Sequence, residues 1–248
     1  MSKNKKIIVL GATSQIAHET ARNFAREKAQ FFLVSRSQAK LEEIKKDLLV
    51  LGAESVDISA AELEDNSKHA GLVEEFKGKF DDFDTVLIAY GSLSDQDKCQ
   101  SDVHLALKEL NINFTSVASI LTLLANYFES RGSGTIAVIT SVAGDRGRKK
   151  NYVYGAAKSA LETFLQGMRN RFGKSGIQIL TVKPGFVDTP MTKDFKKGPL
   201  FASAEKVGAD IHRAIKNGKD VIYTPGFWCF IMLIIKLIPE KIFKKLNI

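Results

Sequence analysis

Cysteine is scarce in this sequence. Only Cys99 and Cys229 occur among the 248 residues, and they are far apart, without the spacing of a metal-binding pair. The four histidines are scattered and also lack the spacing of zinc ligands. The sequence therefore predicts neither a disulfide framework nor a metal site, and it favours a reducing compartment.

Long apolar runs are missing from most of the chain. The opening MSKNKKIIVLG has only a short apolar run, 7–10, before a glycine, which is too little for the core of a signal peptide. No nucleic-acid-binding motif accompanies the net charge of +8. We therefore expect a cytoplasmic protein with no nucleic-acid partner.

Short apolar strands and helices alternate regularly along the chain. Most of the strands are continuously apolar, which is typical of a parallel sheet covered by helices on both faces. The pattern predicts an α/β fold: a single doubly wound Rossmann domain with a mostly parallel sheet over 1–225, and a hydrophobic and amphipathic helical tail over 226–248. Strands are expected at 7–10, 31–34, 55–57, 85–89, 134–140, 178–183 and 221–224.

Glycine is sparse where the first strand meets the first helix. A strand, a glycine turn and a helix N-terminus can hold a phosphate, because free amides and the helix dipole face the anion. Gly11 occupies this turn, but Gln15 and Ala17 stand where further glycines would let the backbone approach a pyrophosphate. An ordinary strand-to-helix turn is therefore the alternative to a phosphate site.

The end of the second strand bears on the choice of cofactor. In a dinucleotide-binding fold this position meets the adenosine ribose, where an acid binds the 2′-hydroxyl and an arginine suits a 2′-phosphate. Arg36 stands there with no acid beside it, so the sequence favours NADP over NAD. Asp57, on the third strand, is placed to contact the adenine or caps the following turn.

One stretch, 140–159, combines Ser141, Tyr154 and Lys158. The tyrosine and lysine are four residues apart, so a helix places them on one face. An ammonium beside a phenol lowers the tyrosine pKa from about 10, and such a tyrosine can exchange a proton with a substrate oxygen. Taken alone the spacing is a weak signal, because a half-buried tyrosine and a solvent-reaching lysine fit it equally well.

Residues 6–224 resemble the short-chain dehydrogenase/reductase family. The spacing from Ser141 to Tyr154, 154 − 141 = 13, is usual in that family, as are SVAG after the fifth strand and PGFVDTPM after the sixth. Gln15, Ala17 and Tyr90 depart from its pattern. The ordered matches are the Gly11 turn, Asp57, Ala89-Tyr90-Gly91, Asn113, Ser141, Tyr154 with Lys158, and Pro184-Gly185.

This resemblance implies an NAD(P)-dependent oxidoreductase acting on a ketone or alcohol, and a homo-oligomer. Tyr154 would exchange the proton, Lys158 would lower its pKa and bind the nicotinamide ribose, and Ser141 would orient the substrate oxygen. Asn113 would support a proton relay through water, or make only local hydrogen bonds. The cofactor would contact Gly11, Thr13, Ser14, Gln15, Ile16, Arg36, Asp57, Ala89, Gly91, Tyr154, Lys158, Pro184, Gly185, Val187 and Thr189.

A narrower resemblance, in 88–95, 143–155 and 238–248, is to reductases of a polyprenyl-phosphate-linked keto-sugar in cell-envelope synthesis. It implies a lipid-linked substrate, although Arg36 departs from that subfamily, which usually uses NADH. Another hydrophobic ketone, fatty-acyl or steroid-like, is one alternative, and a nucleotide-binding scaffold without turnover is another. Arg146 and Arg148 stand beside the predicted site, where they bind a substrate phosphate or form a solvated basic loop.

The tail is the one strongly apolar segment. Residues 227–238 would form a helix about 18 Å long, which is shorter than a bilayer core of about 30 Å. Pro239 opens a second helix with apolar residues on one face and lysines on the other (Ile242, Phe243, Leu246; Lys241, Lys244, Lys245). This suits peripheral contact with the inner face of a membrane. Burial against the domain or another subunit is the alternative.

Overall fold

A computed structural model describes residues 5–246 and confirms the predicted α/β fold. The first four residues of the predicted domain and the last two of the predicted tail lie outside this range. Seven strands form one sheet in the order β3-β2-β1-β4-β5-β6-β9, and every neighbouring pair is parallel. The strands are β1 (Lys6–Leu10), β2 (Gln30–Ser35), β3 (Ser55–Ala60), β4 (Thr85–Ile88), β5 (Ser133–Ile139), β6 (Gly176–Pro184) and β9 (Val221–Thr224).

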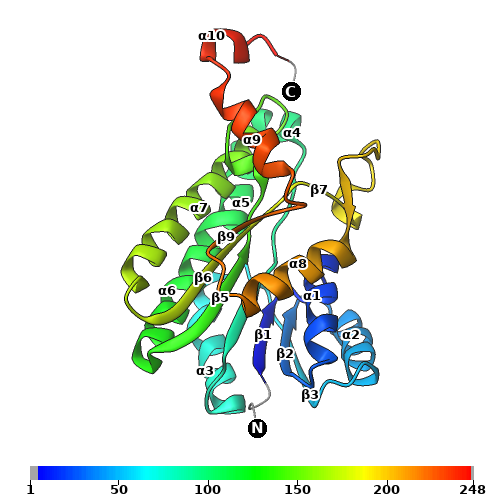
Figure 1. Ribbon diagram of the computed structural model, residues 1–248, viewed down its shortest axis with the longest axis vertical. Helices are drawn as coiled ribbons and strands as arrows, with labels where there is room; N and C mark the ends of the chain where they lie inside the picture. The colour runs from blue at the N-terminus through cyan, green and yellow to red at the C-terminus, as the bar shows by residue number, and fades with distance from the viewer. Residues whose placement is uncertain (1–4, 247–248) are drawn as a thin grey trace.

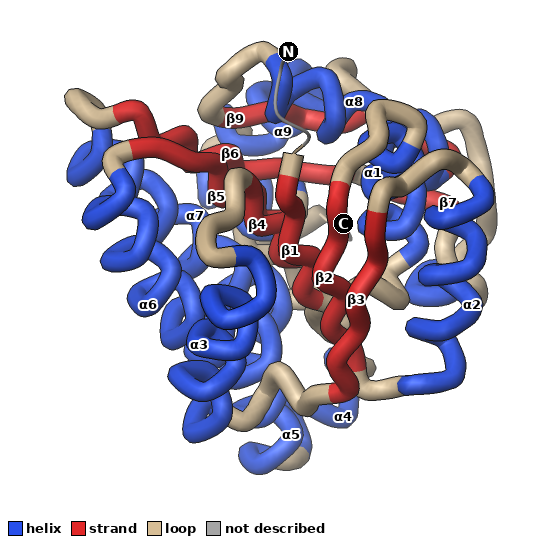
Figure 2. Tube along the Cα trace, turned by 90° about the horizontal axis from the view of Figure 1, so that it is seen from below, coloured by secondary structure: helices blue, strands red, loops and turns tan. Residues whose placement is uncertain are grey.

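Helices cover both faces of this sheet (Figures 1 and 2). Successive strand side chains point to opposite faces. Ile7 and Val9 therefore join one core cluster while Ile8 and Leu10 join the other. One layer contains α1 (Gln15–Ala25), α2 (Gln38–Val50) and α8 (Ala204–Lys216); the other contains α3 (His69–Phe80), α6 (Ser116–Arg131) and α7 (Tyr152–Phe172).

β1 pairs with β2 on one side and with β4 on the other, so strands 2 and 3 extend the sheet in one direction and the later strands extend it in the opposite direction. Such a switch point leaves a crevice at the carboxyl ends of the strands. Gly11 turns the chain there with φ +83°, and a Cβ at this position would lie 2.5 Å from the backbone nitrogen of Tyr90. Both the conformation and the close approach therefore require glycine.

The segment before α6 contains two short helices and a π-helical turn. It consists of α4 (Gln96–Ser101), α5 (Val103–Leu110) and a π-helical turn, Asn111–Thr115, which runs into α6. π-Turns inside helices frequently occur at functional sites. This one contains Asn113, and it turns that side chain into the buried interior.

A second, two-stranded sheet lies between β6 and α8 in the chain. β7 (Phe186–Asp188) pairs in parallel with β8 (Phe201–Ser203), and a 3₁₀ turn, Pro190–Thr192, lies between them. Two further 3₁₀ turns are Asn66–Lys68 and Val142–Gly144. Ser203 is the N-cap of α8, and its hydroxyl accepts a hydrogen bond from the Lys206 backbone nitrogen at 3.3 Å.

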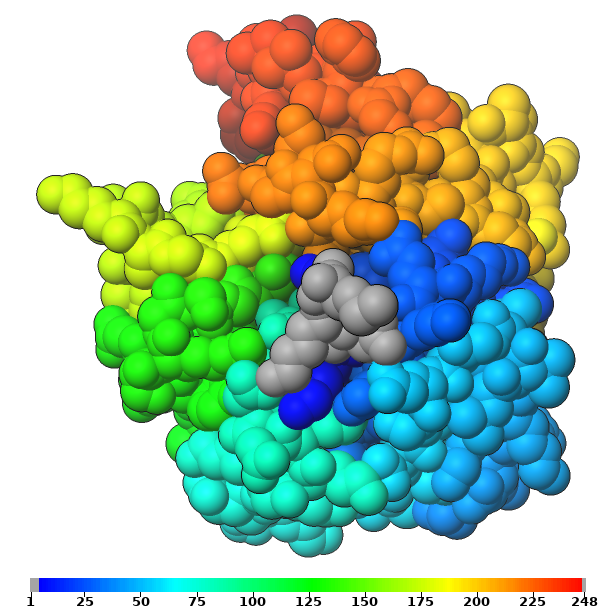
Figure 3. All heavy atoms as spheres, turned by 60° about the horizontal axis from the view of Figure 1, so that its bottom comes forward, coloured from blue at the N-terminus to red at the C-terminus, as the bar shows by residue number. Residues whose placement is uncertain are grey.

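The tail forms the two expected helices, α9 (Trp228–Leu237) and α10 (Glu240–Phe243), which lie at one end of the molecule (Figure 1). The space-filling view shows them as a lobe at the edge of the protein, in red (Figure 3). Trp228 and Met232 are buried in a small core with Val142. Between residues 5 and 246, no helix combines the length and the apolar character that a membrane crossing needs.

Candidate active site

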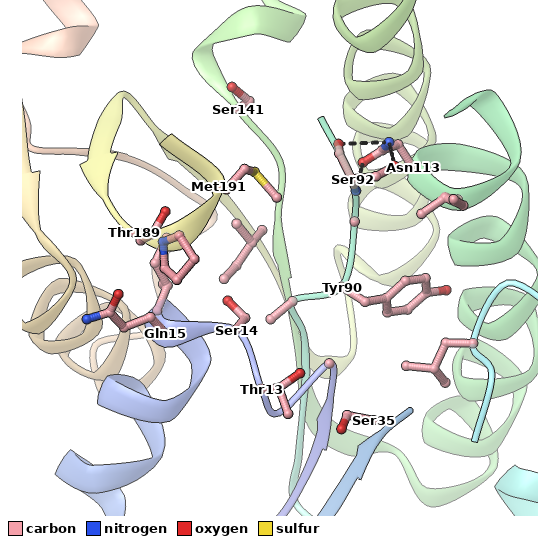
Figure 4. A pocket seen from close by; sticks show the side chains of 18 of the residues that line it. Thr13, Ser14, Gln15, Ser35, Tyr90, Ser92, Asn113, Ser141, Thr189 and Met191 are labelled. Atoms are coloured by element: carbon pink, nitrogen blue, oxygen red, sulfur yellow. Dashed lines mark hydrogen bonds between the residues drawn. The ribbon is translucent and has the colours of Figure 1, made fainter. Parts of the chain in front are cut away.

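A cavity of about 530 Å³ opens at the carboxyl edge of the sheet. All the site residues predicted from the sequence line it except Asp57, Arg146 and Arg148. The cavity therefore brings together segments from the first strand–helix turn to the loop after β6. Figure 4 shows Thr13, Ser14 and Gln15 on one side of it, and Tyr90, Ser92 and Asn113 on the other.

The three proton-handling candidates meet at this cavity. Ser141 follows β5 and begins a 3₁₀ turn, where its Oγ accepts a hydrogen bond from the Ala143 backbone nitrogen at 3.1 Å. Tyr154 lies in the first turn of α7, close enough to Ser141 for the serine hydroxyl to affect its pKa. Lys158 lies one turn later, with Nζ 5.6 Å from the centre of the tyrosine ring. A substrate oxygen between Ser141 and Tyr154 would contact both hydroxyls.

The pKa of Tyr154 is shifted in the direction opposite to the one expected from the sequence. Burial raises the pKa of Tyr154 to about 12, and the negative charges of Glu109 and Glu162 add to this rise, while the hydrogen bond with Ser141 opposes it. The loss of solvation of the phenolate is the largest cause. Tyr154 is thus held in its protonated form at neutral pH, which is the form that donates a proton.

Lys158 is buried and has a lowered pKa. Desolvation lowers the pKa of Lys158 to about 8, while the charges of Glu109 and Glu162 act to raise it. The side chain is therefore an ammonium below about this pH. An ammonium here stabilises negative charge that develops on the Tyr154 oxygen during proton donation.

Asn113 is fully buried and held by a carboxylate that the sequence did not reveal. Its Nδ2 donates to Oε1 of Glu109 at 2.9 Å and to the backbone oxygen of Ser92 at 3.2 Å, while its Oδ1 accepts from the Ser92 nitrogen at 3.3 Å. Glu109 is only 1% exposed and also accepts from the hydroxyls of Ser92 and Ser94. In the sequence, only the four-residue spacing of Glu109 and Asn113 pointed to this contact. The same spacing is common between residues on solvated helix faces, so it does not predict a buried pair.

Gly91 is the point where this network meets the lysine. A Cβ at Gly91 would lie 2.7 Å from Oδ1 of Asn113 and 3.4 Å from Nζ of Lys158. Glycine at this position in the loop after β4 leaves room for both polar groups.

The adenosine end of the predicted site requires one correction. β3 pairs with β2 as far as Ala60, so Asp57 lies in the middle of that strand rather than at its end, and its carboxylate is 2.9 Å from Nζ of Lys79. Asp57 therefore does not line the cavity, and its adenine contact stays a prediction. Glu62, two residues after the true strand end, lines the cavity instead.

Arg36 lies where it was expected, at the exposed end of the cavity. Its side chain is 73% exposed, and its Nε is 4.0 Å from Oε2 of Glu62. Glu62 is not beside Arg36 in the sequence, because it follows the next strand, β3. Both a cation and an anion therefore stand at this end of the cavity.

The cavity walls fit a dinucleotide. Ser14, at the N-cap of α1, makes no side-chain hydrogen bond to the first helical turn, so that turn keeps its amides available for an anion. A Cβ at Gly11 would collide with the backbone of Tyr90, and one at Gly91 with the Asn113 side chain, so glycine keeps the backbone close to its neighbours at both positions. A dinucleotide would place its central pyrophosphate at the turn, its adenosine toward Arg36 and its other ring near Gly91.

Arg146 and Arg148 do not line the cavity. Nη1 of Arg146 donates to the backbone oxygens of Ile235 at 2.6 Å and Ile238 at 2.7 Å, and its guanidinium is stacked on Phe243 at 3.6 Å. Arg148 donates to the backbone oxygen of Val142 at 3.1 Å. The phosphate contact stays a prediction, but the structure gives both guanidiniums protein partners.

A buried ion cluster, also missed from the sequence, supports the turn that carries Ser141. Nζ of Lys183 lies 2.5 Å from Asp145 and 2.6 Å from Glu162, and the Tyr223 hydroxyl donates to Asp145 at 2.8 Å. Burial alone would lower the pKa of Lys183, but hydrogen bonds to both carboxylates raise it. The cluster joins the turn after Ser141 to α7 and β6.

Comparison with known proteins agrees with this site. The model of the short chain dehydrogenase family matches residues 5–199. An uncharacterized oxidoreductase of Mycobacterium tuberculosis is 31% identical over 240 residues, which are 97% of this chain and 96% of that protein. An uncharacterized oxidoreductase of Streptomyces coelicolor is 29% identical over 243 residues, covering 98% and 96%.

Two solved structures share the fold. A variant of the actinorhodin polyketide ketoreductase with NADPH has a TM-score of 0.81 and 21% identity, covering 92% of this chain and 98% of its own. An alcohol dehydrogenase from the archaeon Thermococcus sibiricus, complexed with 5-hydroxy-NADP, has a TM-score of 0.77 and 18% identity, covering 88% and 95%.

Proposed function

The chain belongs to the short-chain dehydrogenase/reductase family and is an NAD(P)-dependent oxidoreductase, and we propose that it uses NADPH to reduce a ketone on a hydrophobic substrate. The observation that carries this proposal is the cluster of Ser141, Tyr154 and Lys158 on one wall of the cavity. In reduction, Tyr154 is the proton donor at the substrate oxygen.

The cofactor supplies a hydride to the carbonyl carbon when bound. The side chains of this protein manage the charge that then develops on the oxygen. Ser141 donates a hydrogen bond to it, Tyr154 transfers its proton, and the Lys158 ammonium stabilises the resulting phenolate. The phenolate then takes back a proton from the Lys158 ammonium, and the neutral amine regains one from water along a path that Asn113, fixed by Glu109, would orient.

The choice of NADPH rests on Arg36. A guanidinium at the exposed end of the cavity suits a 2′-phosphate, which it can bind through paired, charge-assisted hydrogen bonds. Glu62 would instead bind the 2′-hydroxyl of NADH, so NAD is the alternative cofactor. The two similar solved structures contain NADPH and an NADP derivative, which supports the first choice.

The proposed substrate class is a polyprenyl-phosphate-linked keto-sugar. It is supported by the resemblance to decaprenylphosphoryl-2-keto-erythropentose reductase and by exposed apolar residues at the open side of the cavity, such as Met191. A fatty-acyl or steroid-like ketone is the second candidate, favoured by the same apolar surface. Either substrate would place the protein, as a homo-oligomer, at the inner face of a membrane.

A substrate panel tests this proposal. Purified protein with NADPH is offered a polyprenyl-phosphate ketose, a long-chain fatty-acyl ketone and a steroid ketone, and NADPH oxidation is followed by absorbance. Preferential turnover of the first supports the keto-sugar, and preferential turnover of either other ketone replaces it by the second candidate. Bound NADPH with no oxidation on any ketone would favour a scaffold without turnover.

A further inference from the structure

The outward face of α9 carries a continuous apolar stripe. Phe230 is 70%, Ile234 66% and Leu237 72% exposed, and Leu233 is half exposed between them. Their spacing, i, i+3, i+4 and i+7, places all four on one side of the helix. A single exposed leucine is ordinary, but a complete exposed face on an otherwise apolar helix indicates a surface that is covered in use.

The opposite face of α9 is fixed to the active-site walls. Trp228 packs so closely on Gly185 that a Cβ there would lie 1.8 Å from its Nε1. Trp228 and Met232 are buried against Val142, in the turn that follows Ser141. The stripe is therefore presented by a helix that is packed against the domain.

Arg146 fastens the end of this helix. Its guanidinium binds the last carbonyl groups of α9, forms an ion pair with Glu240 at 3.0 Å, and lies over the ring of Phe243. Carbonyl groups at a helix C-terminus lack partners within the helix, and a cation satisfies them. Both tail helices are thus held in one orientation relative to the turn that carries Ser141.

The charge around the stripe decides what covers it. Lys236, Lys241, Lys244 and Lys245 are all exposed, whereas Glu240, the one acid between 226 and 246, is engaged by Arg146. Exposed Ile242 and Leu246 extend the apolar surface between these lysines. Apolar residues flanked by lysines suit the boundary between acyl chains and anionic headgroups.

We propose that α9 and α10 form a docking surface for an anionic lipid bilayer, with the stripe of Phe230, Leu233, Ile234 and Leu237 inserted at the interface. α9 is too short to span the membrane, so the protein lies on it. β9 leads into α9 at the carboxyl edge of the sheet, the edge where the cavity opens. Docking therefore holds the cavity beside the bilayer.

Vesicle sedimentation tests this surface with the full chain. Vesicles of phosphatidylcholine alone are compared with vesicles that also contain phosphatidylglycerol. Phe230→Ser with Ile234→Ser removes two inserted side chains and should weaken binding to the anionic vesicles at least about tenfold. Val50→Ser is the matched control, because Val50 is 87% exposed on α2, far from the tail in sequence, and should bind like the native chain.

The lysines are tested separately. Lys244→Gln with Lys245→Gln should weaken binding to anionic vesicles on the order of tenfold and reduce the preference over phosphatidylcholine. Lys40→Gln with Lys46→Gln, two exposed residues of α2, makes the same change in net charge elsewhere and should leave binding unchanged.

The outcomes separate this proposal from the reductase function. Loss of vesicle binding in both tail variants, with NADPH binding and turnover of a water-soluble ketone retained, supports the docking surface. A native chain that binds neither vesicle, or tail variants that bind like the controls, overturns it. If sedimentation velocity shows that Phe230→Ser with Ile234→Ser dissociates an oligomer and the native chain ignores vesicles, the stripe is a contact between copies and the proposal is wrong.

Discussion

Oε1 of Glu109 accepts a hydrogen bond of 2.9 Å from Nδ2 of Asn113, so a buried carboxylate fixes the asparagine that faces the catalytic lysine. The same carboxylate lies close enough to Lys158 that its charge raises the lysine pKa against the larger effect of burial. Glu109 therefore acts both on the orientation of Asn113 and on the protonation of Lys158.

Replacing Glu109 should shift the pH dependence of reduction. The folded-state pKa of Lys158 is lowered to about 8, so the ammonium that reduction needs is present below this pH and is lost as the pH rises through it. Glu109→Gln keeps the hydrogen-bonding shape but removes a charge that raises this pKa. The fall in kcat/KM should therefore begin at a lower pH in Glu109→Gln, measured from about pH 6 to about pH 10.

Glu109→Asp is the matched control for this shift. It keeps the negative charge but shortens the reach to Asn113, so the rate should drop while the pH of the fall stays near that of the native enzyme. Equal pH profiles for the native enzyme and Glu109→Gln would show that the charge of Glu109 has no effect on Lys158.

Arg36 should decide between the two cofactors. Loss of charge-assisted hydrogen bonds to a 2′-phosphate in Arg36→Gln should raise the Kd for NADPH about tenfold, while the Kd for NADH changes little. Fluorescence titration with both cofactors measures this. Glu62→Gln removes the neighbouring acid and should leave NADPH binding intact or tighter. A native enzyme that clearly prefers NADH would contradict the assignment of Arg36.

Gly185 should tolerate no side chain. The added methyl of Gly185→Ala would collide with Trp228, so either the loop or α9 must move, which costs about 1–3 kcal/mol. The melting temperature should fall by roughly 2–4 °C for each kcal/mol, and calorimetry measures it. Gly226→Ala, where a Cβ meets open space, is the control. Similar melting temperatures for both variants would mean that Trp228 does not pack against Gly185.

The sequence predicted the local features of this protein well. Continuously apolar strands identified a parallel sheet, and the spacing of Tyr154 and Lys158 placed these two residues on one helix face, which lines the cavity. These features depend on short-range periodicity, which is visible in a single sequence. The helical tail and its break at Pro239 could be predicted from the same short-range pattern.

The features that the sequence did not show concern residues whose partners are distant in sequence. The end of β3 is set by its pairing with β2 as far as Ser35 and Ala60, and this brings Glu62 rather than Asp57 to the cavity. Arg146 binds residues about 90 positions further along the chain, and no sequence pattern around Arg146 indicates these partners. The raised pKa of Tyr154 could not be predicted either, because it depends on burial of the side chain by segments that are distant in sequence.

The central claim is that Tyr154 donates the proton in ketone reduction, and Tyr154→Phe tests it most directly. The substitution removes only the hydroxyl, so the Kd for NADPH should stay within about threefold of the native value while NADPH oxidation by the preferred ketone falls by about 10²–10⁴. Ser159→Ala, an exposed position on the same helix, should keep native turnover. Turnover by Tyr154→Phe at a rate close to that of the native enzyme would contradict the mechanism.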